Sequence, residues 1–486
     1  MTNNNNHKTE LPAGWVWTKI DELISEQGVF CDGDWVESKD QDPNGDVRLI
    51  QLADVGDGSF KDKSNRFLTS EKARELNCTY LEKGDILVAR LPDPLGRACI
   101  FPLEGKGKYV TVVDVCIVRP ETNDINSKYL LYVINSPQTR TEVDKYKSGS
   151  TRKRISRTNF ARIEFPLPPL AEQQRIVDKI EELFSDLDHS VAALETARAQ
   201  LDIYRQAVLK HAFEGKLTEL WRQQHQPPPA ADLLAHIQTE RKQQFDSKSK
   251  YQDPTLPDTN ELAELPTGWI WVSLDQLTSL ITSGSRGWAK YYSDHGAIFI
   301  RAQDIKTDAL NLDTVAHVDL PNRIEGSRTR VAKDDLLVTI TGANVTKTAL
   351  VKQQLDEAYV NQHVALIRPV CGELSPYLYF WIISPAQGRR QLEKHAYGMG
   401  KPGLNLTNLR ELVIALPSLA EQRAIVDEIE ARLSVVDKLA ETIDTALHQA
   451  EALRQSILKQ AFAGKLVPQN ADDEPAEVLL ERIKRQ

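Results

Sequence analysis

The stretch LAEQQRIVDKIE at residues 170–181 recurs as LAEQRAIVDEIE at residues 419–430, with nine of twelve positions identical and an offset of 249. A second stretch, QAVLKHAFEGKL at 206–217, recurs as QSILKQAFAGKL at 455–466 with eight identities and the same offset. No gap is needed between the two stretches in either copy. Self-similarity at one fixed separation predicts a duplicated structural unit.

The duplication extends upstream into two less similar blocks. LPAGWVW at 11–17 corresponds to LPTGWIW at 265–271, and GDILV at 84–88 corresponds to DDLLV at 334–338. Both blocks contain short β-branched runs bounded by Gly, Pro, Asn and Asp, a pattern typical of strands. We therefore expect two α+β globular domains that share a scaffold and have diverged elsewhere.

Each repeated stretch belongs to a longer segment with an apolar residue every three or four positions, which predicts one long helix with a narrow apolar seam. A seam of this width most simply pairs with its own copy. The predicted packing residues are Ile176, Ile180, Leu187, Leu194, Leu201 and Val208 in the first helix, and Ile425, Ile429, Val436, Ile443, Leu453 and Ile457 in the second.

The predicted fold class is therefore α+β, with two globular domains separated by two long antiparallel coiled-coil helices and related by an internal pseudo-two-fold axis. A spacer of this kind between two divergent domains would act as a ruler. The predicted order is a first globular domain at 1–165, a central helix at 166–221, a polar linker at 222–262, a second globular domain at 263–416, a C-terminal helix at 417–470 and a tail at 471–486.

Length and charge are compatible with a DNA-binding protein of more than one domain. The 486 residues exceed what one compact core usually holds. The net charge is −9, but it is unevenly distributed. Residues 1–60 carry four basic and twelve acidic side chains, whereas residues 61–165 carry twenty and thirteen. Because nucleic-acid binding depends on a local basic surface, the acidic total does not exclude it.

The expected location is the cytoplasm. The sequence contains no run of about 18 apolar residues and no signal peptide. Its five cysteines are scattered without any C-x-x-C pair, which predicts neither a disulfide framework nor a zinc site and suits a reducing compartment.

Catalytic motifs are missing from the sequence. It has no GxxxxGK[ST], HExxH or [DN]PP[YF] pattern. Asp93, Glu104 and Lys106 do have the spacing of a metal-dependent nuclease, in which two carboxylates hold Mg²⁺ and a lysine polarises water. The second copy lacks this pattern. We predict that the chain has no catalytic residue, metal site or cofactor of its own.

A basic cluster precedes the first long helix. The segment SGSTRKRISRTNF at 148–160 mixes cations with hydroxyl residues, which suits phosphate contacts and, for Arg, guanine edges. The corresponding segment of the second copy, GMGKPGLNL at 398–406, is less basic. The candidate DNA-binding residues are Ser150, Arg152, Lys153, Arg154 and Arg157 in the first copy, and Lys401 and Asn405 in the second.

The segment SGSRGWAKYY at 283–292 is a further candidate, because cations alternate with aromatic rings in a glycine-rich loop. Arg286, Lys290 and Tyr291 are its predicted DNA contacts, and Arg301 adds positive charge nearby. A loop pinned by core aromatic residues is the other interpretation. The tryptophan pairs Trp15/Trp17 and Trp269/Trp271 open the two copies, and for them packing is expected.

The motifs LPAGWVW and LPTGWIW, the LAEQ helix starts and the GKL helix ends resemble those of the DNA-specificity subunits of type I restriction–modification systems. The resemblance covers nearly the whole chain in the family's order. It implies two target recognition domains that each read half of an asymmetric bipartite site in double-stranded DNA, with the coiled coil setting the gap.

The resemblance also implies partners that carry the chemistry. Two modification subunits would dock on this chain, bind S-adenosylmethionine and methylate adenines, and two restriction subunits using ATP and Mg²⁺ would join where a system has them. Two other functions stay open on the residues alone. They are a stand-alone Mg²⁺-dependent nuclease and a coiled-coil protein scaffold, which would show no salt-dependent DNA affinity.

Overall fold

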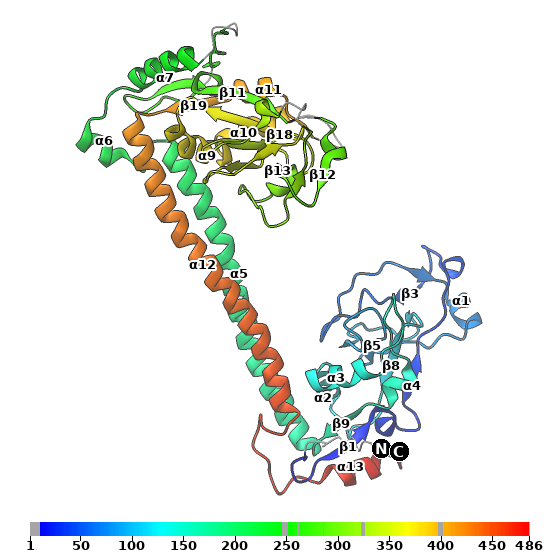
Figure 1. Ribbon diagram of the computed structural model, residues 1–486. Coiled ribbons are helices and arrows are strands. Elements are labelled where there is room, and N and C mark those ends of the chain that lie inside the picture. Colours follow the sequence, from blue (N-terminus) through cyan, green and yellow to red (C-terminus); the bar gives the residue numbers. More distant parts are fainter. Residues whose placement is uncertain are drawn as a thin grey trace. The chain divides into compact units, whose positions relative to one another are not determined.

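The computed structural model describes residues 10–244, 251–259, 262–284, 286–321, 326–396 and 402–485. The chain divides into two compact units: unit 1 takes the residues up to 195 and from 444 onward, and unit 2 takes residues 196–443. The boundaries pass through the long helices α5 (Leu170–Phe213) and α12 (Leu419–Ala461) (Figure 1). Each unit therefore joins one globular domain to part of each long helix.

The globular domain of unit 1 has three small sheets. One pairs β1 with β9, one has the order β2–β8–β5–β6, and one has the order β4–β3–β7, in which β3 and β7 are parallel. The strands are β1 (Val16–Lys19), β2 (Val29–Asp32), β3 (Val47–Ile50), β4 (Phe67–Leu68), β5 (Ile86–Ala89), β6 (Ala98–Ile100), β7 (Tyr109–Thr111), β8 (Val115–Arg119) and β9 (Glu164–Leu167). The shorter helices of the unit are α1 (Ser70–Glu75), α2 (Ser127–Ile134), α3 (Pro137–Lys145), α4 (Arg157–Ala161) and α13 (Ala476–Ile483).

Unit 2 repeats this topology. Its sheets have the orders β10–β19, β11–β18–β15–β16 and β12–β14–β13–β17, and β13 and β17 are parallel. The strands are β10 (Ile270–Ser273), β11 (Thr278–Ser283), β12 (Tyr292–Ser293), β13 (Ala297–Ile300), β14 (Ala316–Val318), β15 (Leu336–Thr339), β16 (Thr348–Leu350), β17 (Ala358–Val360), β18 (Val364–Pro369) and β19 (Val413–Leu416). The helices are α6 (Glu219–His225), α7 (Ala230–Gln244), α8 (Leu274–Leu277), α9 (Ser375–Ile383), α10 (Gly388–His395) and α11 (Leu406–Arg410). Apart from the additional edge strand β12, the strand orders of the two units match, which confirms the predicted duplicated α+β fold.

The two long helices run antiparallel, as predicted. In unit 1, Ile176 and Ile180 near the start of α5 share a core with Ile457 near the end of α12. In unit 2, the end of α5 and the start of α12 share a core, which includes Val208 and Ile425. Neither helix buries its seam without the other.

An ion pair between the helices occurs twice with exchanged roles. In unit 2, Arg205 on α5 donates to Asp437 on α12 with an N–O distance of 2.6 Å. In unit 1, Arg454 on α12 donates to Asp188 on α5. The offset of 249 relates Arg205 to Arg454 and Asp188 to Asp437. Reciprocal contacts of this kind are what a two-fold relation between equivalent helices produces.

The predicted seam needs one correction, at Leu453. Its side chain is 50% exposed, whereas the other predicted seam residues are buried or half-buried. The neighbouring Arg454 takes the inward position, with its guanidinium 4.3 Å from the centre of the Phe184 ring. At this point of α12 the residue that faces α5 is therefore Arg454 and not Leu453. The ion pair with Asp188 and the contact with the Phe184 ring hold the arginine there.

The repeated sequence motifs meet where each long helix begins. Trp15 donates its indole N–H to Glu172 at 2.9 Å, and Trp269 donates to Glu421 at 2.9 Å. All four side chains are buried. Burial raises the pKa of Glu172. The GW and LAEQ motifs are therefore two halves of one buried contact, and the expected packing role of both tryptophans is confirmed.

Two features of the fold require glycine after the ends of the long helices: the backbone conformation and the close approach of a proline. Gly215 and Gly464 have φ angles of 69° and 66°, a region in which other residues are strained. A Cβ at Gly215 would lie 2.6 Å from Cγ of Pro266, and a Cβ at Gly464 would lie 2.2 Å from Cγ of Pro12. The GKL motif therefore packs directly against the LP of the LPxGW motif in each unit.

Helices also occur where the sequence predicted a linker and a tail. The first residue of α7, Ala230, donates its backbone N–H to the carbonyl of Gly268 at 2.9 Å, and the first residue of α13, Ala476, donates to the carbonyl of Gly14 at 2.9 Å. Both glycines belong to the LPxGW motifs. Ala230 and Ala476 are fully buried. The segments 222–262 and 471–486 thus contribute to the cores of units 2 and 1, and the predicted domain boundaries stay predictions.

None of the helices in the described part of the chain is both long enough and apolar enough to cross a membrane.

The Trp–Glu contact generates a prediction for stability. Trp15→Phe leaves the buried Glu172 carboxylate without this donor, so we expect the free energy of unfolding of unit 1 to fall by about 1–3 kcal/mol. The matched control is Trp35→Phe, since Trp35 is 70% exposed, and its effect should stay within about 0.5 kcal/mol. Calorimetric melting of both variants measures the difference, and equal melting temperatures would contradict the role of the contact.

Candidate nucleic-acid interface

The basic cluster of unit 1 forms the tip of a closed loop. Ser148 and Arg154 exchange two backbone hydrogen bonds, each of 2.9 Å. Between them, Gly149 has a φ of 93°, and a Cβ there would lie 2.4 Å from the carbonyl oxygen of Arg152. This tight turn leaves the side chains of residues 150–154, including Ser150 and Lys153, exposed. The loop thus presents three adjacent cations to solvent.

Arg157, predicted to bind DNA with this cluster, also contacts its own domain. Its guanidinium donates to the backbone carbonyl of Phe30 at 2.7 Å and lies 5.7 Å from the centre of that ring. Its Nε is 3.9 Å from the carboxylate of Asp32. These contacts anchor α4 to β2, and the DNA contact predicted for Arg157 stays a prediction.

The two carboxylates of the nuclease-like pattern lie near lysines. Lys153 lies 3.8 Å from Asp93, and Lys83 lies 2.6 Å from Glu104. The hydrogen bond from Lys83 lowers the pKa of Glu104. Among the described residues, no group of three or more His, Cys, Asp or Glu side chains is placed to hold a metal ion. The geometry gives the nuclease interpretation no support.

The glycine-rich loop of unit 2 is pinned by aromatic packing, one of the two interpretations of its sequence. Trp288 is 5% exposed and stacks on Phe299 with ring centres 5.7 Å apart. Arg286 and Lys290 are exposed, and the Lys290 ammonium lies 5.0 Å from the centre of the Tyr291 ring. The two cations therefore face solvent on a loop whose tryptophan is in the core.

Arg301, another predicted DNA contact, is held by its own domain. Its Nε and Nη2 donate to the carboxylate of Asp304 at 3.1 Å each, and Nη2 also donates to the carbonyl of Thr314 at 3.0 Å. These bonds to Asp304 raise the pKa of Arg301. These bonds occupy Nε and Nη2, and the DNA contact predicted for Arg301 stays a prediction.

The remaining predictions for unit 2 concern the segment before α11. Asn405 caps that helix, since its side chain accepts from the backbone N–H of Asn408 at 2.8 Å. Lys401 lies outside the described residues. The chain just after it borders a pocket of unit 2, because Gly342, which lines that pocket, donates its backbone N–H to the carbonyl of Pro402 at 3.0 Å.

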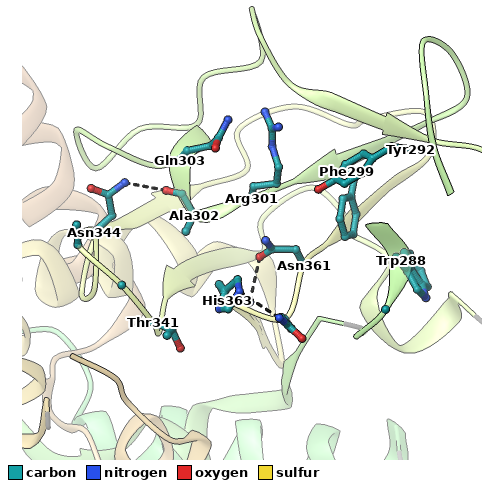
Figure 2. Close-up of a pocket in the computed structure, with 14 residues that line it drawn as sticks. Trp288, Tyr292, Phe299, Arg301, Ala302, Gln303, Thr341, Asn344, Asn361 and His363 are labelled. Atoms are coloured by element: carbon teal, nitrogen blue, oxygen red, sulfur yellow. Dashed lines mark hydrogen bonds between the residues drawn. The ribbon is translucent and has the colours of Figure 1, made fainter. Parts of the chain in front are cut away.

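This pocket has a volume of about 510 Å³. Figure 2 shows the aromatic side chains at one side of it, Gln303 and Asn344 at the other, and Asn361 between them. The aromatic side chains are those of Trp288, Tyr292 and Phe299, and the polar ones are those of Arg301, Gln303, Thr341, Asn344, Asn361, Gln362 and His363. Sequence reasoning identified Arg301 but missed the amides. The available signal was that amide residues follow the short apolar runs at 297–300, 336–340 and 358–360.

Comparison with known proteins shows which family the chain is similar to. The profile of the type I restriction modification DNA specificity domain matches residues 12–195 and 292–449. The specificity subunit of the type I restriction enzyme EcoBI from Escherichia coli is 26% identical over 381 residues, which cover 76% of this chain and 74% of that protein. The specificity subunit of EcoEI, also from Escherichia coli, is 25% identical over 512 residues, covering 92% and 83%.

Two solved structures share the fold. A chain from a study of complex assembly and conformational transition of the type I R-M system has a TM-score of 0.65 and 18% identity, with 94% of this chain and 100% of that chain covered. The HsdS subunit from Thermoanaerobacter tengcongensis has a TM-score of 0.52 and 17% identity, with 94% and 99% covered. Since the family profile spans most of the chain and falls in both repeated parts, the chain belongs to the type I restriction–modification DNA specificity family.

Proposed function

We propose that this chain is the DNA-recognition subunit of a type I restriction–modification complex. Each unit reads one half of an asymmetric bipartite site in double-stranded DNA, and the helix pair sets the gap between the halves. One observation carries the proposal: the two units share strand order and buried anchors, yet their exposed loops differ. Unit 1 presents a cationic tip at 150–154, whereas unit 2 presents an amide-lined pocket.

In this proposal the chemistry belongs to partner subunits. Two modification subunits dock on the chain, bind S-adenosylmethionine and methylate one adenine per strand. Two restriction subunits that use ATP and Mg²⁺ join where the system has them. This chain itself is non-catalytic and acts on DNA in the cytoplasm.

The alternative function is that of a coiled-coil protein scaffold, and a measurement of DNA binding distinguishes it from the proposed function. The cationic tip favours recognition of DNA, because a cluster of exposed Arg and Lys neutralises phosphates and makes affinity fall with salt. A scaffold would show no such dependence.

The first prediction concerns the tip of unit 1. Replacing Arg152, Lys153 and Arg154 by alanine should weaken DNA binding by the assembled complex. The slope of log affinity against log salt concentration should also become shallower, by the equivalent of up to about three phosphate contacts. If an arginine grips a base, discrimination at one pair of the first half-site should also relax. Fluorescence anisotropy over a salt series measures both effects.

The matched control removes the same charge from unit 1 outside the tip, by replacing the exposed Lys63, Lys83 and Lys106 with alanine. It should leave affinity and salt dependence nearly unchanged. An equal loss in the control and the tip variant would place the DNA-binding face of unit 1 elsewhere.

The second prediction concerns the helix pair. Four residues inserted after Ala199 lengthen α5 by roughly 6 Å and rotate the downstream part of the helix by about 40°. Since B-DNA rises about 3.4 Å per base pair, the gap of the methylated motif should grow by one or two base pairs while both half-sites stay the same. Genome-wide mapping of methylated adenines gives the motif.

The same insertion placed after Gln244, where α7 ends, leaves both long helices unchanged and serves as the control. New half-sites at the original spacing in the Ala199 variant would refute the ruler.

A further inference from the structure

We infer that the pocket of unit 2 reads the edge of an adenine in the second half-site, with Gln303 and Asn344 as the specificity-determining residues. This inference rests on the proposed function, because it assumes that unit 2 contacts DNA. It goes further by naming the residues and the base.

Strand pairing brings three turns together at the pocket. β13 and β17 are parallel, with Ile300 opposite Val360, so the residues just after these strands emerge side by side. A hydrogen bond of 2.9 Å from the backbone N–H of Asn361 to the carbonyl of Ile300 joins them. Asn344, in the turn between β15 and β16, donates its amide to the carbonyl of Ala302 at 3.1 Å. The amides therefore sit on a pre-formed support, which base discrimination needs.

The bonding partners of the two amides dictate which atoms stay open. Arg301 has only donors, so the Gln303 atom that faces it is the oxygen, which accepts from Nη2 and Nη1 at 2.9 and 3.3 Å. Nε2 of Gln303 then points away from Arg301. Asn344 uses its amide nitrogen on Ala302, so its Oδ1 stays unpaired within the described residues. Two residues that line the pocket thus offer one donor and one acceptor.

A pocket that offers both a donor and an acceptor suits adenine. In the major groove adenine presents the N7 acceptor beside the N6 amino donor, and side-chain amides are its usual partners, whereas guanine presents two acceptors and calls for Arg or Lys. The one guanidinium among the residues described as lining the pocket, that of Arg301, is bound to Asp304, which is 3% exposed. The pocket therefore favours a base edge over a phosphate.

The aromatic side suits a base as well. Tyr292 is 48% exposed, and its ring packs edge-on against Phe299 with centres 5.8 Å apart. An exposed ring beside amides can contact the methyl group of the paired thymine or a base face.

Unit 1 lacks both amides. The strand pairs that flank these positions correspond without gaps at an offset of 250, which places Ala53 opposite Gln303 and Pro94 opposite Asn344. Neither residue has a polar side chain. The adenine-reading pair is therefore a property of unit 2, and its loss should affect only one half-site.

The test uses the chain assembled with its modification subunits. Gln303→Glu keeps the oxygen that accepts from Arg301 and removes only the donor, while Asn344→Ala removes the acceptor. Competition binding with duplexes substituted at each pair of the second half-site measures discrimination, and methylation mapping gives the motif. At one A·T pair we expect discrimination to fall about 10-fold or more. Gln303→Glu should shift preference toward cytosine, whose amino group a carboxylate accepts.

Discrimination at the first half-site should stay unchanged, and this doubles as the check that each variant is folded. Gln353→Ala, which removes an exposed amide of unit 2 outside the pocket, is the matched control and should keep the original motif. The inference is overturned if both variants retain full discrimination at every position, or if the relaxed pair is G·C. If the unaltered chain directs no bipartite methylation at all, the proposed function fails instead.

Discussion

The antiparallel pairing of α5 with α12 is the constraint on which the other features of the structure depend. A helix of this length with a narrow apolar seam cannot bury that seam alone, so each helix needs its copy. In unit 1 the start of α5 pairs with the far end of the chain: the end of α12 and the helix α13 pack onto the first globular domain. In unit 2 the helix that corresponds to α13 is α7, which lies between the two repeats in the sequence. The reciprocal Arg–Asp pairs hold the register in both units.

Buried anchors explain why some motifs occur in both copies while neighbouring residues differ. Trp15 and Trp269 each satisfy a buried glutamate at the start of a long helix. Gly215 and Gly464 each allow a proline to pack where a side chain would collide. A change at any of these positions leaves a buried group unpaired or creates overlap, whereas the exposed loops carry no such cost. The scaffold is thus constrained and the loops can diverge.

The divergence gives the two units different chemistry. The unit 1 tip offers exposed cations, which suit phosphates and guanine edges, whereas the unit 2 pocket has its arginine neutralised by Asp304 and offers amides. A two-fold scaffold with unlike surfaces is what an asymmetric target requires.

The sequence by itself determined the duplication, the element types and the helix seam, because each is written in local periodicity or in identity at a constant offset. It also identified Trp15 and Trp269 as packed residues. Only the tertiary structure decided that Arg157 and Arg301 are bound internally, since their partners Phe30 and Thr314 are set by strand and loop placement. The pocket likewise joins turns around Gln303, Asn344 and Asn361, which are far apart in sequence and meet only because β13 pairs with β17 and Asn344 reaches the carbonyl of Ala302.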